Sequence, residues 1–142
     1  MDYCFRILFI IFSLAAAGSN PIRLTGWSGV PAMHAAVLHD GTVVFLDKIE
    51  NRSQLYLPDG RRAYSSIYNP RTTRVNPLSV RTNPFCCGGA FLADGRLATF
   101  GGNGMLEEDA SIGDGFDAIR YLNSSNTKTG WFEPGNKLAS KR

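Results

Sequence analysis

The stretch AVLHDGTV, residues 36–43, recurs 54 residues later as AFLADGRL, residues 90–97. In each copy an apolar run precedes an Asp-Gly pair, and a second apolar run follows it, Val43–Leu46 in the first copy and Leu97–Phe100 in the second. Asp-Gly between two β-prone runs predicts a hairpin with a type I′ turn, in which both central residues take positive φ. We therefore expect two antiparallel hairpins, one in each half of the chain.

A turn-forming segment also recurs at nearly the same period, each time after a strand-like run. These pairs are Ala63–Tyr68 followed by Tyr68–Thr72, and Ala118–Tyr121 followed by Tyr121–Ser125. A further strand is expected after each turn, near Arg74–Val80 and near Lys128–Phe132. Four short antiparallel strands in roughly 50 residues are the size of one blade of a kelch-type β-propeller. The sequence thus predicts an all-β fold, about two blades of a presumed seven-bladed ring.

The repeat also predicts that the ring is incomplete. A third blade would start near residue 141, whereas the sequence ends at Arg142. Two blades cannot close a ring, and they would leave an apolar face and unpaired strand edges exposed. We therefore expect a truncated N-terminal part of a propeller, with self-association of several copies as the alternative.

The N-terminus carries a short apolar segment over residues 7–17 that ends in small residues, Ala15-Ala16-Ala17-Gly18. It is shorter than the roughly 20 apolar residues that span a bilayer, and its length suits a signal peptide. We predict a signal peptide over residues 1–18, the propeller part over residues 19–142 and a secreted protein. An uncleaved anchor or a buried strand remains the alternative. Two sequons place candidate glycans on Asn51 and Asn123.

The composition is that of an ordinary globular protein, with 44% hydrophobic and 19% charged residues and a net charge of +3. The basic residues are scattered rather than clustered with aromatic residues, which argues against a nucleic-acid partner. No stretch after the N-terminal one is long and apolar enough to cross a membrane, so we expect no membrane association after signal cleavage.

Signal cleavage would remove Cys4 and leave only the adjacent pair Cys86 and Cys87. Adjacent cysteines make a poor disulfide, because one peptide bond holds their Cα atoms too close together. From the residues alone, two small buried side chains at the start of a strand are the plainest interpretation. A small redox or metal protein is a weaker alternative, since the pair lacks Cys-x-x-Cys spacing.

Four phrases in order resemble the glyoxal oxidase family of galactose oxidase-like copper radical oxidases. They are VPAMHAAVL (30–38) with DGTVVFLD (40–47), NPFCCGGAFLADG (83–95) with GGNG (101–104), DGFDAIR (114–120) and WFEPGNKLA (131–139). The resemblance covers almost everything after the predicted signal peptide. It implies one copper ion and a tyrosine radical cross-linked through a thioether to a cysteine. It also implies oxidation of a small aldehyde or primary alcohol, with O2 reduced to H2O2.

The resemblance places the cross-linked cysteine at Cys86 and puts Cys87 where the family usually has a small residue, often Ser. The partner tyrosine would follow Arg142, and the histidine ligands would come from later blades. The resemblance therefore implies no metal ligand in this chain, no bound copper and no oxidase activity of the fragment alone. His34 matches a family position that is not a metal ligand, and His39 is expected to be exposed. A non-catalytic kelch-type binding module that self-associates is the alternative function.

Overall fold

The computed structural model describes residues 24–47, 53–126 and 130–142. These residues form two antiparallel sheets and a single short 3-10 helix, with no α-helix, so the predicted all-β class is confirmed. The predicted signal peptide and the sequon residue Asn51 lie outside the described residues. Within the described part, no helical segment has the length and hydrophobicity that crossing a bilayer requires.

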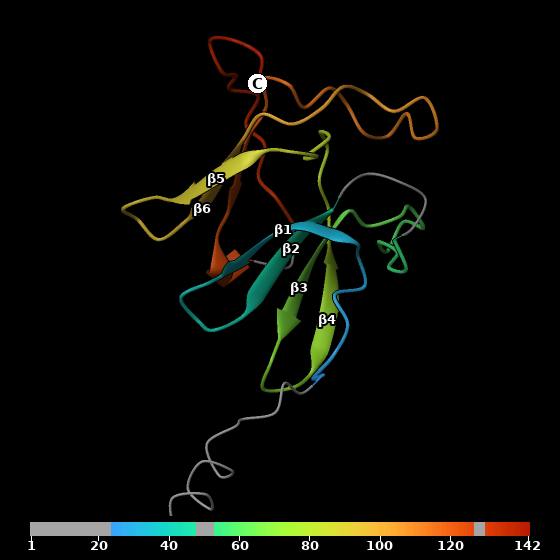
Figure 1. The fold of residues 1–142 in the computed structure, drawn as a ribbon, viewed down its shortest axis with the longest axis vertical. Coiled ribbons are helices and arrows are strands. Elements are labelled where there is room, and N and C mark those ends of the chain that lie inside the picture. The colour runs from blue at the N-terminus through green and yellow to red at the C-terminus, as the bar shows by residue number, and fades with distance from the viewer. Residues whose placement is uncertain (1–23, 48–52, 127–129) are drawn as a thin grey trace, which may run out of the picture.

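The first sheet is a four-stranded meander of β1 (Ala32–Val37), β2 (Val43–Asp47), β3 (Ser65–Asn69) and β4 (Arg74–Leu78). Each strand is hydrogen-bonded to the one that follows it in the chain (Figure 1). Exposure alternates along β1 and β4, as expected for strands with one face toward a core. The predicted hairpin followed by two more strands is confirmed here.

The second sheet contains β5 (Gly88–Phe91), β6 (Leu97–Phe100) and β7 (Ile119–Leu122), and the 3-10 helix η1 (Ser124–Asn126) follows β7. The strand expected near Lys128–Phe132 is represented by a single antiparallel bridge between Tyr121 and Phe132. Residues 127–129, where that strand would begin, are outside the described part. The two sheets do not close a ring.

The hairpin turns correct one detail of the sequence prediction. Gly41 N donates to Leu38 O at 2.9 Å, and Leu38 N donates to Thr42 O at 2.8 Å. Gly41 has φ +81° whereas Asp40 does not have positive φ, so the turn is type I closed by a left-handed glycine, not type I′. The backbone of Asp40 keeps an ordinary conformation without positive φ. Its side-chain Oδ1 accepts a hydrogen bond from the Thr42 amide at 2.9 Å.

The same turn occurs three times among the described residues, whereas the sequence repeat predicts two copies. Leu92–Gly95 repeats the first turn, and Leu57–Gly60 repeats it within the β2–β3 connection. Pro58 occupies the second position of the added turn, where its fixed φ favours type I. Only one bridge, Tyr56 to Arg62, flanks this turn, so it adds no strand to either sheet.

The two sheets share one hydrophobic core. The β5–β6 hairpin lies beside β1 and β2 (Figure 1). Side chains of both sheets and of the segments between them form one buried cluster: Leu38, Val44, Leu46, Tyr64, Ile67, Leu78, Val80, Cys87, Leu97, Ile112, Leu122 and Trp131. The sheets are therefore parts of one packed unit.

The other face of the first sheet is only partly covered. Tyr68 Oη donates to Thr25 O at 2.9 Å, which places the segment before β1 against β3. On β1, Val37 of the same face is 64% exposed, Met33 at the bulge is 48% exposed, and Trp27 nearby in sequence is 76% exposed. The described residues thus leave the β1 side of this face open to solvent, whereas Ser66 and Tyr68 on β3 are buried.

Candidate functional site

The segment from β4 to β5 crosses from the first sheet to the second and ends in a tight turn. Cys87 N donates to Pro84 O at 3.1 Å, which makes Phe85 and Cys86 the central residues of this turn. Cys86 has φ +61°, and it is exposed. Left-handed backbone is uncommon for a residue with a side chain and is normally filled by glycine in such turns.

The buried side chain of Asn83 fixes the start of this turn. Its Oδ1 accepts the Phe85 amide at 3.0 Å, and its Nδ2 donates to Gly104 O at 2.8 Å. Asn83 is 2% exposed, so both polar ends are bonded within the protein rather than to solvent. The turn that presents Cys86 is therefore tied to the loop after β6.

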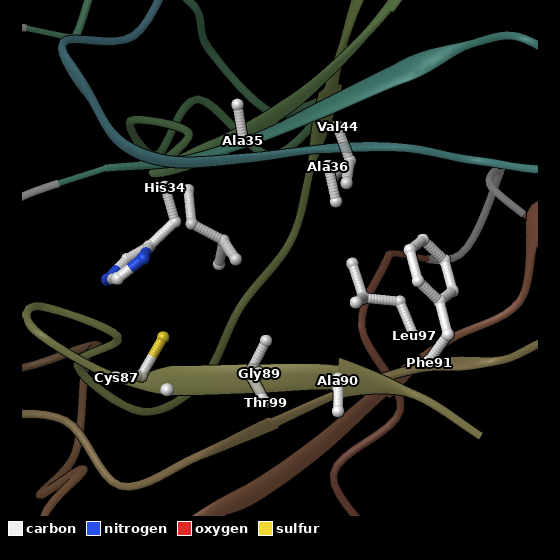
Figure 2. Close-up of a pocket in the computed structure, with 12 residues that line it drawn as sticks. His34, Ala35, Ala36, Val44, Cys87, Gly89, Ala90, Phe91, Leu97 and Thr99 are labelled. Atoms are coloured by element: carbon white, nitrogen blue, oxygen red, sulfur yellow. The ribbon is translucent and has the colours of Figure 1, made fainter.

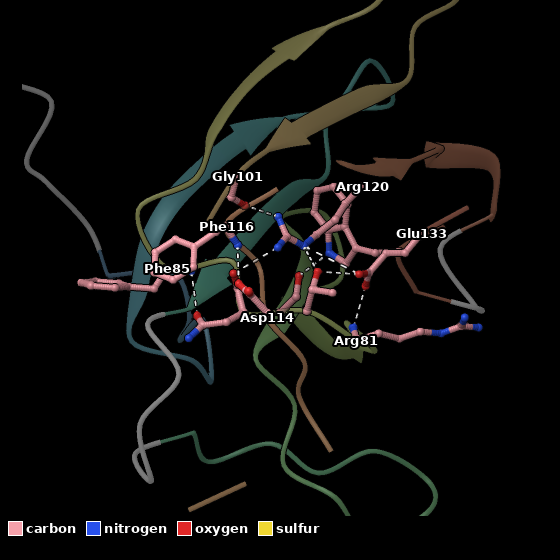
Figure 3. Close-up of polar contacts among 11 residues, drawn as sticks. Arg81, Phe85, Gly101, Asp114, Phe116, Arg120 and Glu133 are labelled. Carbon is pink, nitrogen blue, oxygen red and sulfur yellow. Dashed lines mark hydrogen bonds and ion pairs between the residues drawn. The ribbon is translucent and has the colours of Figure 1, made fainter. Parts of the chain in front are cut away.

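A fully buried arginine holds the backbone of the same segment. From β7, Arg120 donates to three oxygens: Gly101 O at 2.7 Å, Thr82 Oγ1 at 2.8 Å and Asn83 O at 3.0 Å. Its Nε is 3.9 Å from a carboxylate oxygen of Glu133. Figure 3 shows the guanidinium at the centre of these contacts. Burial lowers the pKa of Arg120 and the charge of Glu133 opposes this, but a guanidinium stays protonated in proteins.

Glu133 completes this network from the far end of the chain. Its two carboxylate oxygens accept the Arg81 amide and the Thr82 hydroxyl, each at 2.6 Å. The carboxylate side chain is 7% exposed and that of Arg120 is 0% exposed. Removing one partner would leave the other as an uncompensated buried charge, which is strongly destabilising.

Two glycines let the backbone close around the Asn83 carbonyl. A Cβ on either Gly102 or Gly115 would overlap the Asn83 oxygen, and both would lie close to the Arg120 guanidinium. The Gly101-Gly102-Asn103-Gly104 run directly follows β6 and is a strand end at which backbone segments pack closely.

The two cysteines lie in opposite environments. Cys87 is 2% exposed and lines a cavity of about 180 Å³ between the sheets. Figure 2 shows its thiol and the His34 ring pointing toward each other across this cavity. Burial raises the pKa of the Cys87 thiol, which disfavours the reactive thiolate. Of the pair, Cys86 is the thiol that another group can reach.

The histidines do not form a metal site within the described residues. His34 lies on β1, and its buried Nε2 has no hydrogen-bond partner there. His39 is exposed in the first hairpin turn, as expected, with Nδ1 3.0 Å from Ser124 Oγ. No group of three or more His, Cys, Asp or Glu residues in the described part could hold a metal ion.

The second sequon lies at the end of β7 on an exposed residue. Asn123 Oδ1 accepts the amide of Ser125 at 3.0 Å and its hydroxyl at 2.8 Å. The Asn123 side chain is thus accessible next to its sequon hydroxyl, and glycosylation at Asn123 stays a prediction.

Comparison with known proteins agrees with the resemblance seen in the sequence. The chain is similar to aldehyde oxidase GLOX of Vitis pseudoreticulata. The two are 34% identical over 91 residues, a match covering 54% of this chain and 17% of the relative. The chain therefore spans about one sixth of that protein. No protein-family model matches the chain.

The resemblance singled out Cys86, whose functional role stays a prediction, but the sequence did not predict the residues that hold its turn. Asn83 carries a recognisable signal, because Asn-Pro favours the start of a turn. Arg120 and Glu133 carry none, since an isolated arginine in a short strand is ordinarily expected at the surface. Their pairing depends on bringing together residues 13 positions apart through the loop after β7.

Proposed function

We propose that this chain is the N-terminal part of a secreted copper radical oxidase similar to glyoxal oxidase, in which Cys86 supplies the sulfur of a tyrosine–cysteine cofactor. The observation that carries the proposal is the backbone of Cys86, φ +61°, at an exposed turn held by buried polar contacts. Non-glycine residues kept in such conformations by their surroundings cluster at functional sites. The similarity to an aldehyde oxidase supports the same assignment.

The choice of Cys86 over Cys87 rests on access. A thioether to a tyrosine needs a sulfur that a ring from another segment can approach, and Cys86 is exposed whereas Cys87 is buried. Bond formation removes one hydrogen from the thiol and one from the ring, and the two electrons pass to O2, giving H2O2. A sulfur substituent makes the phenol easier to oxidise, which is the chemistry that this cofactor supplies.

Copper does not fit the described residues, because they contain no suitable group of ligands. In the proposed oxidase the metal ligands and the partner tyrosine come from sequence beyond Arg142. The substrate class is a small aldehyde or primary alcohol, with O2 as the oxidant. No part of the catalytic step is assigned to this chain except the position of the Cys86 sulfur.

We further propose that the two sheets are the first two blades of a kelch-type β-propeller. Three observations support this: the four-stranded meander, the shorter repeat of it and the shared core between them. The open apolar face of the first sheet, with Met33 and Val37 exposed, would be covered by a neighbouring blade.

The test begins by sequencing the transcript past the codon for Arg142 and producing the encoded protein with copper and O2. We expect H2O2 from an aldehyde, and a peptide containing Cys86 joined to a tyrosine and lighter by two hydrogens than the separate peptides. Cys86→Ser should abolish both, and Cys87→Ser, the matched control, should leave the cross-link in place. A cross-link through Cys87, or oxidase activity with Cys86 unmodified, would contradict the proposal.

The alternative, a binding module that self-associates, is favoured by the same open face. If copies of this chain cover that face for one another, the chain forms oligomers in solution, and Met33→Lys with Val37→Lys dissociates them. Sedimentation of the chain distinguishes the two cases, because a monomer at micromolar concentration contradicts self-association.

A further inference from the structure

We propose that Arg120 is a positioning residue for Cys86. With Gly102 and Gly115 it clamps the Asn83 carbonyl and so forces the turn into the left-handed conformation that presents the Cys86 thiol. The role of that thiol rests on the proposed function, whereas the clamp itself can be tested without it.

The turn needs an external restraint. A left-handed backbone disfavours a residue with a Cβ by roughly tenfold in population or more. At φ +61°, Cys86 is in this region, and it is exposed, so packing of its own side chain does not hold it there. The restraint must come from the residues that anchor the ends of the turn.

The anchor is Asn83, whose side chain and carbonyl oxygen are both hydrogen-bonded within the protein. Its side chain bonds to Phe85 N within the turn and to Gly104 O beyond it, at 3.0 Å and 2.8 Å. Its carbonyl oxygen accepts Arg120 Nη2 at 3.0 Å and the Asn103 amide at 3.3 Å. The anchor cannot rotate without breaking the bond to a buried charge.

Arg120 is suited to this role because its other donors are already fixed. Nη1 bonds to Gly101 O at 2.7 Å and Nε bonds to Thr82 Oγ1 at 2.8 Å, so the planar fork has one orientation. Gly102 and Gly115 leave no Cβ between the guanidinium and the Asn83 carbonyl. Figure 3 shows Phe85, inside the turn, on the opposite side of this network from Glu133. Asn83 therefore connects Arg120 to the turn of Cys86, since it bonds both to the guanidinium and to Phe85 N.

The test compares the effect of Cys86→Gly in two backgrounds, the wild-type chain and Arg120→Met. Glycine tolerates the left-handed region, so Cys86→Gly should increase the folding equilibrium constant about fivefold to tenfold in the wild-type chain. If Arg120 enforces the left-handed conformation, Arg120→Met allows residue 86 to leave it. The increase in the folding equilibrium constant caused by Cys86→Gly should then fall to less than twofold. The equilibrium constants come from urea titrations followed by circular dichroism.

Thr73→Gly is the matched control. Thr73 is the other described non-glycine residue with positive φ, at +56°, and it lies in the β3–β4 turn away from Arg120. The change in the folding equilibrium constant caused by Thr73→Gly should be the same in both backgrounds. If Arg120→Met has no folded population, Arg120→Lys keeps the charge while losing the fork, and the same comparison applies.

A gain from Cys86→Gly that is equal in both backgrounds would overturn the proposal, because a merely structural Arg120 would leave the two substitutions additive. A second readout is the backbone chemical shift of residue 86 in Arg120→Lys, which should move away from left-handed values. The proposed cofactor is tested independently. Absence of the thioether in the copper-loaded protein would contradict the proposed function but would leave the non-additivity of the substitutions at residues 86 and 120 unchanged.

Discussion

The indole nitrogen of Trp131 donates to the hydroxyl of Ser65 at 2.9 Å, so a residue next to the second sheet completes the core of the first. Ser65 in turn donates to Phe45 O at 2.7 Å, and both Trp131 and Ser65 are buried. The backbone supports the contact, since Trp131 N donates to Ser79 O at 3.0 Å. One side chain thus links β2, β3 and the end of the chain.

Trp131→Phe should lower the free energy of unfolding by about 2 kcal/mol, because it removes this hydrogen bond and leaves a cavity. Trp27→Phe is the control, since Trp27 is 76% exposed, and it should change stability by less than about 0.5 kcal/mol. Urea unfolding followed by far-ultraviolet circular dichroism measures both. Equal effects of the two substitutions would show that the Trp131 contact is not stabilising.

Gly115→Ala should be among the most destabilising small substitutions, costing about 3 kcal/mol or more, because the new methyl group would overlap the buried Asn83 carbonyl. Gly113→Ala, two residues away, meets only Arg81 O at 3.6 Å and Thr82 Cγ2 at 3.9 Å, which are ordinary contacts. We expect it to cost less than about 1 kcal/mol. Thermal or urea unfolding of the two variants tests this, and similar costs would argue against the close approach.

The three hairpin-like turns predict a loss of stability in acid. Hydrogen bonds from Thr42 lower the pKa of Asp40, and the side chains of Arg61 and Arg96 lower the pKa values of Asp59 and Asp94. Lowered values in the folded state mean that the stabilisation is complete above the unfolded pKa of about 4 and is lost as pH falls through the folded values.

The corresponding experiment is the melting temperature measured between pH 6 and pH 2.5, in the wild-type chain and in the triple variant Asp40→Asn, Asp59→Asn, Asp94→Asn. Asparagine can still accept the backbone amide but does not titrate in this range. The triple variant should therefore have a shallower decline below about pH 4. Two parallel curves would assign the acid sensitivity to other groups.

Thr99→Val should raise the free energy of unfolding by about 1 kcal/mol. Thr99 Oγ1 is buried without a well-formed hydrogen bond in the described part, and its contact with the Cys87 thiol lowers the pKa of that thiol but is a weak hydrogen bond because sulfur is a poor partner. Thr82→Val, the control, removes a hydroxyl bonded to both Arg120 and Glu133 and should be destabilising. If Thr99→Val is destabilising instead, the hydroxyl has a favourable polar partner in the cavity that Thr99 and His34 both line, and the prediction is wrong.

The sequence predicted the strand pattern of the first sheet well, because short apolar runs and Asp-Gly pairs are local signals. It predicted the wrong turn type. The turn starts at Leu38, whose carbonyl accepts the Gly41 amide and whose amide donates to Thr42 O. Gly41 therefore follows the two central residues of the turn instead of being one of them. The Leu57–Gly60 copy was missed because its flanks are not alternating strands and pair only once. The Asp-Gly pair therefore predicts a turn, but it does not predict whether the flanking residues form strands of a sheet.

The site was predicted only in part for a related reason. Cys86 could be singled out from a resemblance in sequence, but its left-handed backbone could not, because its turn is anchored by Asn83, whose carbonyl contacts Arg120 and packs against two glycines. These contacts join segments up to 37 residues apart. No local pattern distinguishes a buried, fully bonded arginine from an exposed one.

The bond between Ser65 and Trp131 spans 66 residues, and this bears on how the chain acquires its structure during synthesis. The strands β1 to β4 leave the ribosome first, yet their core lacks Trp131 until residue 131 has emerged. Contacts of such sequence separation form late, after the entropy of a long loop has been lost. The order in which the sheets are made is thus not the order in which they become stable, and the nascent first sheet must remain unaggregated until Trp131 arrives.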